Sequence, residues 1–116
     1  MKLEGEGQLL RIFVGEGNRW RGKPLYEAVV QRARAAGLAG ATVLRGLMGY
    51  GAKSRIHTAK VLRLSEDLPI VIEIVDRSDR IQAFLPMLDE MVEDGMVTLE
   101  RAQVITYRAG KAEEKT

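Results

Sequence analysis

The chain has 116 residues, which suffices for one domain, because two domains of half that size would each lie near the lower limit for independent folding. Hydrophobic residues make up 46% and charged residues 29%, which excludes a disordered polypeptide, and no apolar run reaches the roughly 18 residues that a membrane helix needs. Without cysteine, and with His57 as its one histidine, the chain cannot form disulfides, thiolate zinc sites or histidine-rich metal sites. The acidic N-terminus lacks the apolar core of a secretory signal, so we expect a cytoplasmic protein without membrane insertion.

The net charge of +2 conceals an asymmetry between the two halves of the chain. Residues 1–63 carry twelve Lys/Arg and four Asp/Glu, a net charge of +8, whereas residues 64–116 carry six and twelve, a net charge of −6. A basic half is typical of proteins that bind an anion such as a nucleotide or a nucleic acid. Attraction between the two halves, or between copies of the chain, explains the same pattern equally well.

The first half of the chain predicts a strand, a loop, a helix and a second strand. Residues 9–14 are mostly apolar and form a strand, and residues 15–23 are a loop rich in Gly and Arg. Pro24 suits the first helical position, and Gly37 suits the left-handed position just after the helix. A second strand is expected over residues 41–46. Helical spacing connects the apolar residues Leu25, Ala28, Val29, Ala33 and Ala36.

The second half predicts a strand, a helix and a final strand. Residues 69–75 are almost continuously apolar, as in a central strand. Ser78 is a suitable N-cap for a helix that Pro86 should kink and Gly95 should end. A last strand is expected at residues 102–107, with a short piece at residues 96–99 before it and a polar tail at residues 110–116. The apolar residues of the helix are Ile81, Phe84, Leu85, Leu88, Met91 and Val92.

This order of elements, β-α-β-β-α-β, predicts an α+β domain with the ferredoxin-like fold over residues 1–116. Four antiparallel strands form the sheet, and two helices cover one of its faces. The predicted third strand alternates Ile70, Ile72 and Ile74 on one face with Val71 and Val75 on the other, so both faces of the sheet are apolar. The face without helices therefore requires a cover, and we expect the chain to associate with itself.

Residues 47–68 form a connection far longer than the two to five residues of a usual hairpin loop, and long loops are commonly functional. Gly46, Gly49 and Gly51 permit close backbone approach near the start of this loop, while Lys53 and Arg55 add positive charge. Exposed amides next to basic side chains can hold a phosphate. A flexible connection with solvated charges is the alternative interpretation.

Two stretches resemble the PII nitrogen-signalling proteins. Gly37-Leu38-Ala39-Gly40-Ala41-Thr42-Val43 is similar to the pattern that ends the first PII helix, and Gly49-Tyr50-Gly51 is similar to the Gly-Phe-Gly at the base of the PII T-loop. The resemblance to a PII-like group, domain of unknown function family 190, is more specific. It includes Gly22-Lys23-Pro24-Leu25-Tyr26-Glu27-Ala28, Gly40-Ala41-Thr42-Val43-Leu44-Arg45-Gly46, Leu68-Pro69-Ile70-Val71 and Val75-Asp76.

The resemblance implies a homotrimer that binds an adenine nucleotide between neighbouring subunits and acts on a partner protein through loop 47–68. By analogy Thr42 would lie near the adenine, Gly49 and Gly51 near the ribose or phosphate, and Arg108 would reach across the interface. The candidate nucleotide-binding residues are Thr42, Gly46, Gly49, Tyr50, Gly51, Lys53, Arg55 and Arg108. We expect no catalytic residue, no metal and no required cofactor.

Two differences from the PII pattern favour ADP or AMP over ATP. PII sequences continue after Gly-Phe-Gly with Arg-Gln, where this chain has Ala52-Lys53. The loop after the second PII helix is rich in glycine and ends in lysine, whereas Glu93 and Asp94 stand here and would repel a phosphate. A trimeric adaptor without a ligand is the alternative function. An RNA-binding module is a weaker alternative, because residues 70–75 lack the aromatic residues that stack on bases.

Six further residues attract attention. Trp20 is expected to anchor an interface between subunits rather than to stack on a ligand. We expect Phe13 in the core and His57 in solvent. Glu73 is a candidate for a buried or interface ion pair, while Asp76 and Asp79 are expected to be capping carboxylates at the start of a helix.

Overall fold

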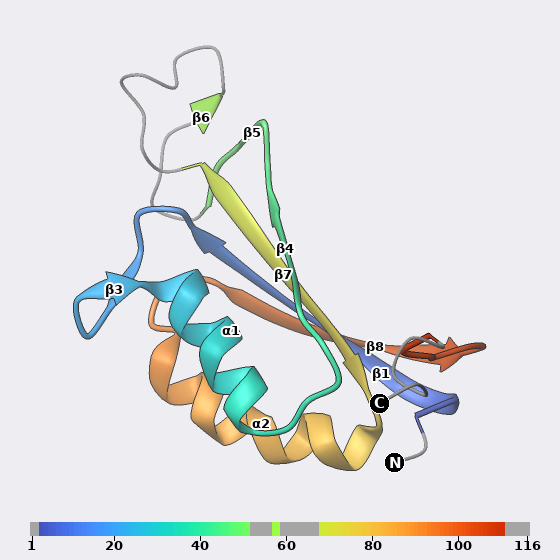
Figure 1. Ribbon diagram of the computed structural model, residues 1–116. Coiled ribbons are helices and arrows are strands. Elements are labelled where there is room, and N and C mark those ends of the chain that lie inside the picture. Colours follow the sequence, from blue (N-terminus) through green and yellow to red (C-terminus); the bar gives the residue numbers. More distant parts are fainter. Residues whose placement is uncertain (1–2, 52–56, 59–67, 111–116) are drawn as a thin grey trace.

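The computed structural model describes residues 3–51, 57–58 and 68–110 (Figure 1). The helices are α1 (Leu25–Ala35) and α2 (Ser78–Met91). The strands of the main sheet are β1 (Gly5–Gly15), β4 (Thr42–Arg45), β7 (Pro69–Asp76) and β8 (Met96–Val104). Two small hairpins complete the described elements, formed by β2 (Arg19–Trp20) with β3 (Lys23–Pro24) and by β5 (Met48–Gly49) with β6 (His57–Thr58).

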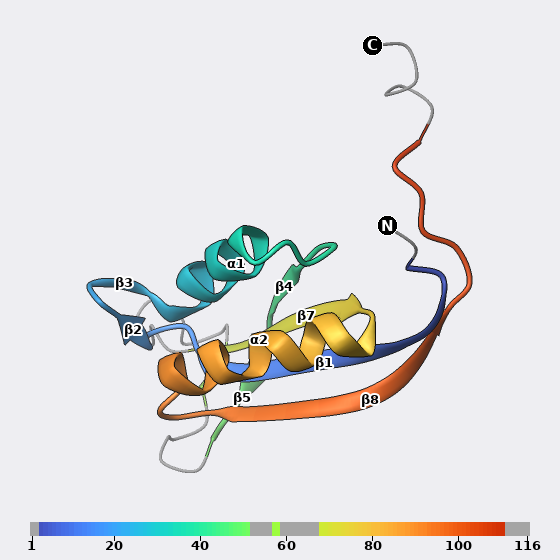
Figure 2. The same cartoon turned by 90° about the horizontal axis from the view of Figure 1, so that it is seen from below.

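The main sheet is antiparallel, with its strands in the order β4-β7-β1-β8. Both helices lie on one side of it, as Figure 2 shows. The predicted α+β, ferredoxin-like arrangement is therefore confirmed. The core fills the space between the sheet and the helices, where alternate residues of β1 and β7 meet the inner faces of α1 and α2. Its largest members include Leu10, Ile12, Ile72, Ile81, Phe84 and Leu88.

Helix α1 ends where the sequence predicts. Gly37 has φ +84°, its N–H donates to the Arg34 carbonyl at 3.0 Å, and the Leu38 N–H donates to the Ala33 carbonyl at 3.1 Å. This pair of bonds is the Schellman motif, which satisfies carbonyls that the last turn would otherwise leave free. The prediction for the helix start was one residue early, because Pro24 is the N-cap and belongs to β3. Ala36, expected in the buried stripe, is exposed.

The predicted ends of α2 were wrong at both termini. Arg77 is the N-cap with an extended backbone, so Ser78 is the first helical residue rather than the cap. The helix stops at Met91, and Gly95 lies in the following turn, where its α-carbon passes close to β1. Pro86 lies inside the helix as predicted, and the helix continues through it.

Strand β8 is longer and starts earlier than the sequence indicates. It runs without a break from Met96 to Val104 along β1, so the expected separate piece at residues 96–99 is part of it, and residues 105–107 lie beyond its end. Strand β1 likewise extends past both ends of the predicted residues 9–14. Long-range pairing between the two strands, rather than local propensity, sets their lengths.

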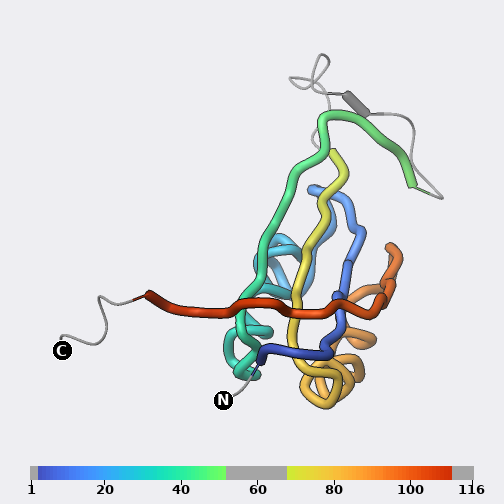
Figure 3. Tube along the Cα trace, turned by 90° about the vertical axis from the view of Figure 1, so that its right-hand side faces the viewer, coloured from blue at the N-terminus to red at the C-terminus, as the bar shows by residue number. Residues whose placement is uncertain are grey.

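None of the helices and strands that the structure describes covers the face of the sheet opposite α1 and α2. Register places Leu9, Arg11 and Phe13 of β1 on this open face, next to alternate residues of the neighbouring strands: Thr42, Leu44, Val71, Glu73, Val75, Met96, Thr98 and Glu100. The prediction that Phe13 belongs to the core was therefore wrong, because its neighbour Ile12 takes the inward position. Figure 3 shows the strands of the sheet and the segment that follows β8 toward the C-terminus.

Candidate functional site

The connection from α1 to β4 forms the first group of candidate residues. Thr42 is the first residue of β4, is exposed, and pairs with Glu73. The preceding turn is fixed by Asp76, whose Oδ2 accepts a hydrogen bond from the Ala39 N–H at 2.9 Å. Tyr107 reaches the same turn from the segment after β8, and its hydroxyl donates to the Ala39 carbonyl at 3.1 Å. Arg108, the next residue, is exposed. The structure therefore brings Arg108 to the end of the molecule where Thr42 lies.

The glycines of the second group surround Pro69 at the start of β7. The Gly46 N–H donates to the Pro69 carbonyl at 2.7 Å. A Cβ added at Gly46 would lie 2.8 Å from Pro69 Cγ, and one at Gly49 would lie 2.9 Å from the same atom. Packing against the proline ring thus requires glycine at both positions, which is a reason that the sequence interpretation did not include.

The remaining candidates continue from this group into the long loop. Tyr50 and Gly51 are exposed, and both follow β5. Lys53 and Arg55 lie outside the described residues. The backbone of His57 pairs with Gly49 in the small β5–β6 hairpin. Next to the Pro69 group, Arg45 Nη2 lies 3.1 Å from Oε2 of Glu16, an ion pair that sequence reasoning missed.

The two groups lie at opposite ends of β4. In the antiparallel register with β7, Thr42 faces Glu73, whereas Gly46 bonds to Pro69 four residues further along. At about 3.3 Å per residue, that separation is about 13 Å between backbones, and β5 continues beyond it. Figure 1 shows the α1–β4 connection at one end of β4 and β5 at the other. One chain therefore does not gather all the predicted residues around one point.

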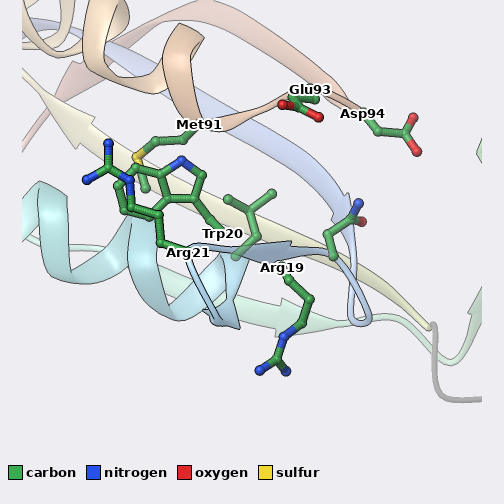
Figure 4. Close-up of a pocket in the computed structure, with 8 residues that line it drawn as sticks. Arg19, Trp20, Arg21, Met91, Glu93 and Asp94 are labelled. Atoms are coloured by element: carbon green, nitrogen blue, oxygen red, sulfur yellow. The ribbon is translucent and has the colours of Figure 1, made fainter.

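A cavity of about 220 Å³ lies between the β2–β3 hairpin and the end of α2 (Figure 4). Trp20 is held there by two cations, with the guanidinium carbons of Arg21 and Arg32 at 4.4 and 5.4 Å from its ring centroid. Glu93 and Asp94 border the cavity and are exposed. The indole also packs against the core, while its expected role between subunits stays a prediction.

Two ion pairs on the open face confirm Glu73 as an ion-pair residue. Arg11 Nε lies 2.9 Å from Oε2 of Glu73, and Arg11 Nη1 lies 3.0 Å from Oε2 of Glu100. The hydrogen bond that Arg11 donates to Glu73 is the largest cause that raises the pKa of Arg11, so the guanidinium stays charged. Three charged groups thus stand among the apolar residues of this face. The ion-pair partner of Glu73 comes from β1, a strand distant in the sequence, which sequence spacing could not reveal.

The two carboxylates at the start of α2, those of Asp76 and Asp79, have different roles. Asp76 is fully buried and accepts the Arg77 N–H at 2.7 Å. Asp79 lies in the first helical turn, where Arg77 binds both of its oxygens at 3.1 and 2.8 Å. The hydrogen bond from Arg77 lowers the pKa of Asp79. The predicted location of both acids at a helix start is confirmed, although neither caps the helix with its side chain.

No helix in the part of the chain that the structure describes is long and apolar enough to cross a membrane. Within residues 3–51, 57–58 and 68–110, no group of three or more His, Asp or Glu side chains is arranged to hold a metal ion.

Solved structures with the same fold are PII-like proteins. CPII from Thiomonas intermedia K12, bound to ADP and bicarbonate, matches with a TM-score of 0.59 and 19% identity over 90% of this chain and 93% of that one. A second CPII structure, bound to ADP, AMP and bicarbonate, gives 0.60. The GlnK–ATP complex of B. subtilis gives 0.52 at 14% identity, covering 87% of this chain and 85% of that one. These likenesses establish the PII-like fold.

Relatives in sequence carry the description UPF0166 protein. One from Aquifex aeolicus is 41% identical over 98 residues, which is 84% of this chain and 92% of the relative. Another from Methanocaldococcus jannaschii is 31% identical over 100 residues, or 85% and 92%. The family model DUF190, described as an uncharacterized ACR, matches residues 7–104. The chain therefore belongs to the DUF190 (UPF0166) family of PII-like proteins.

Proposed function

We propose that this protein is a regulator that binds an adenine nucleotide between the copies of a homotrimer and transmits its presence through loop 47–68 to a partner protein. The observation that carries the proposal is the division of the candidate residues between the two ends of β4. Thr42 and Arg108 form one half of the site, and Gly46, Gly49, Tyr50 and Gly51 form the other. Two copies in head-to-tail contact would join unlike halves into one complete site.

The distribution of exposed apolar residues supports this kind of contact. The two edge strands of the sheet both present apolar side chains to solvent: Val43 and Leu44 on β4, and Met96, Val97 and Leu99 on β8. Because these edges lie on opposite sides of the sheet, a contact between β4 of one copy and β8 of the next is heterologous. Heterologous contacts close into a ring when the rotation between copies permits it. The open face of the sheet would be covered in such a ring.

The nucleotide proposed is ADP or AMP in preference to ATP. CPII structures contain ADP or AMP, and their fold is the one found here. In this chain Glu93 and Asp94 are exposed at the turn between α2 and β8, so a chain of three phosphates reaching that turn would meet two carboxylates. Like charges raise the cost of binding a longer polyphosphate. Neither a catalytic base nor a nucleophile is needed for this role, and we propose binding rather than catalysis.

Calorimetric titration with AMP, ADP and ATP tests the ligand, and light scattering tests the assembly. We expect a mass near three times that of the chain, and binding that weakens from ADP or AMP to ATP. An intact trimer that binds none of the three would instead support the adaptor without a ligand. A monomer would contradict the shared site.

Mixing subunits tests whether the site is shared between copies. Arg108→Ala disables one half and Gly51→Val disables the other, so each variant alone should lose most of its ADP binding. Co-refolded one to one, the two variants should recover about a quarter of the sites, because that share of interfaces pairs two intact halves. If the mixed variants recover no ADP binding, the whole site lies within one chain.

A further inference from the structure

The backbone N–H and carbonyl of Ala39 are both bound by side chains distant in the sequence. Its N–H donates to Oδ2 of Asp76 at 2.9 Å, and its carbonyl accepts the Tyr107 hydroxyl at 3.1 Å. Ala39 lies three residues before Thr42, and Tyr107 directly precedes Arg108. The backbone of one residue, Ala39, therefore connects the two residues that form the first half of the proposed site.

The Asp76 side of this contact is anchored in the core. Asp76 is 0% exposed and also accepts hydrogen bonds from the Arg77 N–H at 2.7 Å and from Arg80 Nε at 3.3 Å. The Arg80 guanidinium donates in turn to the Gly37 carbonyl. Asp76 thus ties the α1–β4 turn to the first turn of α2, and it is buried with its donors in place.

The Tyr107 side is anchored less deeply. The Tyr107 N–H donates to Oε2 of Glu4 at 2.9 Å, and both residues are exposed. Beyond Val104 the chain leaves β8, and the Tyr107 side chain reaches the α1–β4 turn. Removing the Tyr107 hydroxyl would therefore release the segment that carries Arg108 while the turn stays bound to Asp76.

We propose that Asp76 and Tyr107 are positioning residues, which fix the backbone of Ala39 and thereby set Thr42 and Arg108 relative to each other for an adenine nucleotide. This inference rests on the proposed function, and it identifies the groups that fix the geometry of the site. A long arginine side chain on an unanchored segment must be ordered when the ligand binds, and this ordering weakens binding. The Tyr107 hydroxyl removes part of that cost in advance.

Hydrogen exchange without any ligand tests the contact itself. In Tyr107→Phe, amides of residues 105–108 should exchange faster, while residues 37–41 stay slow because Asp76 still holds them. The matched control is Tyr26→Phe, which removes a hydroxyl from the first turn of α1. Equal exchange of residues 105–108 in Tyr107→Phe and Tyr26→Phe would overturn the contact.

Titration with ADP and with adenosine tests the positioning. Loss of one hydrogen bond should weaken ADP binding about threefold to tenfold in Tyr107→Phe. Within this proposal the guanidinium of Arg108 pairs with the phosphate, as arginine does in many proteins. Adenosine, which has no phosphate, should therefore bind to Tyr107→Phe as it does to the wild type. In Asp76→Asn, both ligands should bind more weakly, because the turn before Thr42 loosens.

The outcomes separate this inference from the proposed function. If wild-type protein binds neither ADP nor adenosine, the proposed nucleotide function fails, while the exchange experiment still decides whether Tyr107 holds the segment. If the wild type binds ADP and Tyr107→Phe binds it equally well, the positioning role is overturned. The same holds if Tyr107→Phe weakens adenosine binding as much as it weakens ADP binding. Should Asp76→Asn fail to fold, Tyr107→Phe alone is decisive.

Discussion

Arg11 Nε lies 2.9 Å from Oε2 of Glu73 on the face of the sheet that no helix covers. The same guanidinium reaches Glu100 on β8, so one cation joins carboxylates of the two strands that flank β1. About a third of each side chain of the Arg11–Glu73 pair is exposed. In the proposed trimer this face is buried, and a charge pair that solvent now screens would move into a less polar surrounding.

Arg11→Met should weaken the trimer more than it weakens the fold of one chain. The substitution leaves Glu73 and Glu100 without their cation on an apolar face, and burial of unpaired carboxylates opposes association. Light scattering over a dilution series should therefore show dissociation at a higher protein concentration than for the wild type. The double variant R11M/E73M should regain most of the loss, since it removes one of the unpaired charges. An R11M trimer that dissociates like the wild type would show that this face lies outside the interface.

Gly95→Ala should destabilise the domain, because there is no room for a side chain between the end of α2 and β1. A Cβ at this position would lie 2.5 Å from the Phe13 carbonyl oxygen and 3.0 Å from Val14 Cγ1. Backbone atoms cannot move away as a flexible side chain can, so we expect a loss of about 1–3 kcal/mol in the free energy of unfolding.

The matched control for this substitution is Gly40→Ala. A Cβ there meets nothing within 4 Å, and the residue does not have the positive φ that favours glycine. Its free energy of unfolding should stay within about 0.5 kcal/mol of the wild type. Urea denaturation compares the two variants. Equal stability of Gly95→Ala and Gly40→Ala would contradict the close packing at Gly95.

The contribution of Asp79 to stability should depend on pH. Arg77 lowers the pKa of Asp79 from its ordinary value of 3.8, so the carboxylate is more acidic in the folded than in the unfolded chain. A group of this kind stabilises the fold above its unfolded pKa, and this contribution disappears as the pH falls through the folded pKa. Its place in the first turn of α2 adds a favourable interaction with the helix dipole.

Asp79→Asn should therefore lower the urea midpoint at pH 7, and the difference from the wild type should vanish at pH values well below 3.8. Asp89→Asn is the control in the same helix, since Asp89 lies in the last turn, where a negative charge opposes the dipole. That variant should be as stable as the wild type at pH 7 or slightly more stable. A pH-independent loss in Asp79→Asn would point to packing rather than charge.

Features governed by neighbouring residues were predictable from the sequence. Gly37 ends α1 because a left-handed residue next to the last turn completes a local hydrogen-bond pattern, and the helix and strand order follows from apolar spacing. Ser78 was assigned as the N-cap on local preference. In the structure the N-cap is Arg77, which has an extended backbone and donates its N–H to Asp76. The helix therefore begins at Ser78, one residue earlier than a serine N-cap would give.

Features governed by distant residues were not predictable. The polar residues at positions 100–101 do not favour a strand in the sequence. β8 nevertheless continues through them, because β1 supplies pairing partners along the whole of β8. The same holds for the candidate site. Glycines 46 and 49 were interpreted as phosphate contacts, but their contacts with Pro69 come from a strand that begins about 20 residues later. Neither the bond from Tyr107 to Ala39 nor the division of the site along β4 has a sequence signature.

Pro86→Ala should stabilise the protein. Pro86 is exposed within α2, so its ring is not needed for packing, and it cannot donate the backbone hydrogen bond to the carbonyl of Gln82. In a helix interior proline is about 3 kcal/mol less favourable than alanine. Proline also restricts the unfolded chain, which offsets about 0.4–1 kcal/mol of this difference. We therefore expect the free energy of unfolding to rise by about 2 kcal/mol.

Pro24→Ala provides the opposite case in the same chain. Pro24 precedes α1 with φ −57°, a value that proline adopts without strain, so its substitution should cost about 0.4–1 kcal/mol through the unfolded state alone. Thermal and urea unfolding of the two variants should move in opposite directions from the wild type. If Pro86→Ala is no more stable than the wild type, the missing hydrogen bond at residue 86 costs α2 less than the expected value of about 2 kcal/mol.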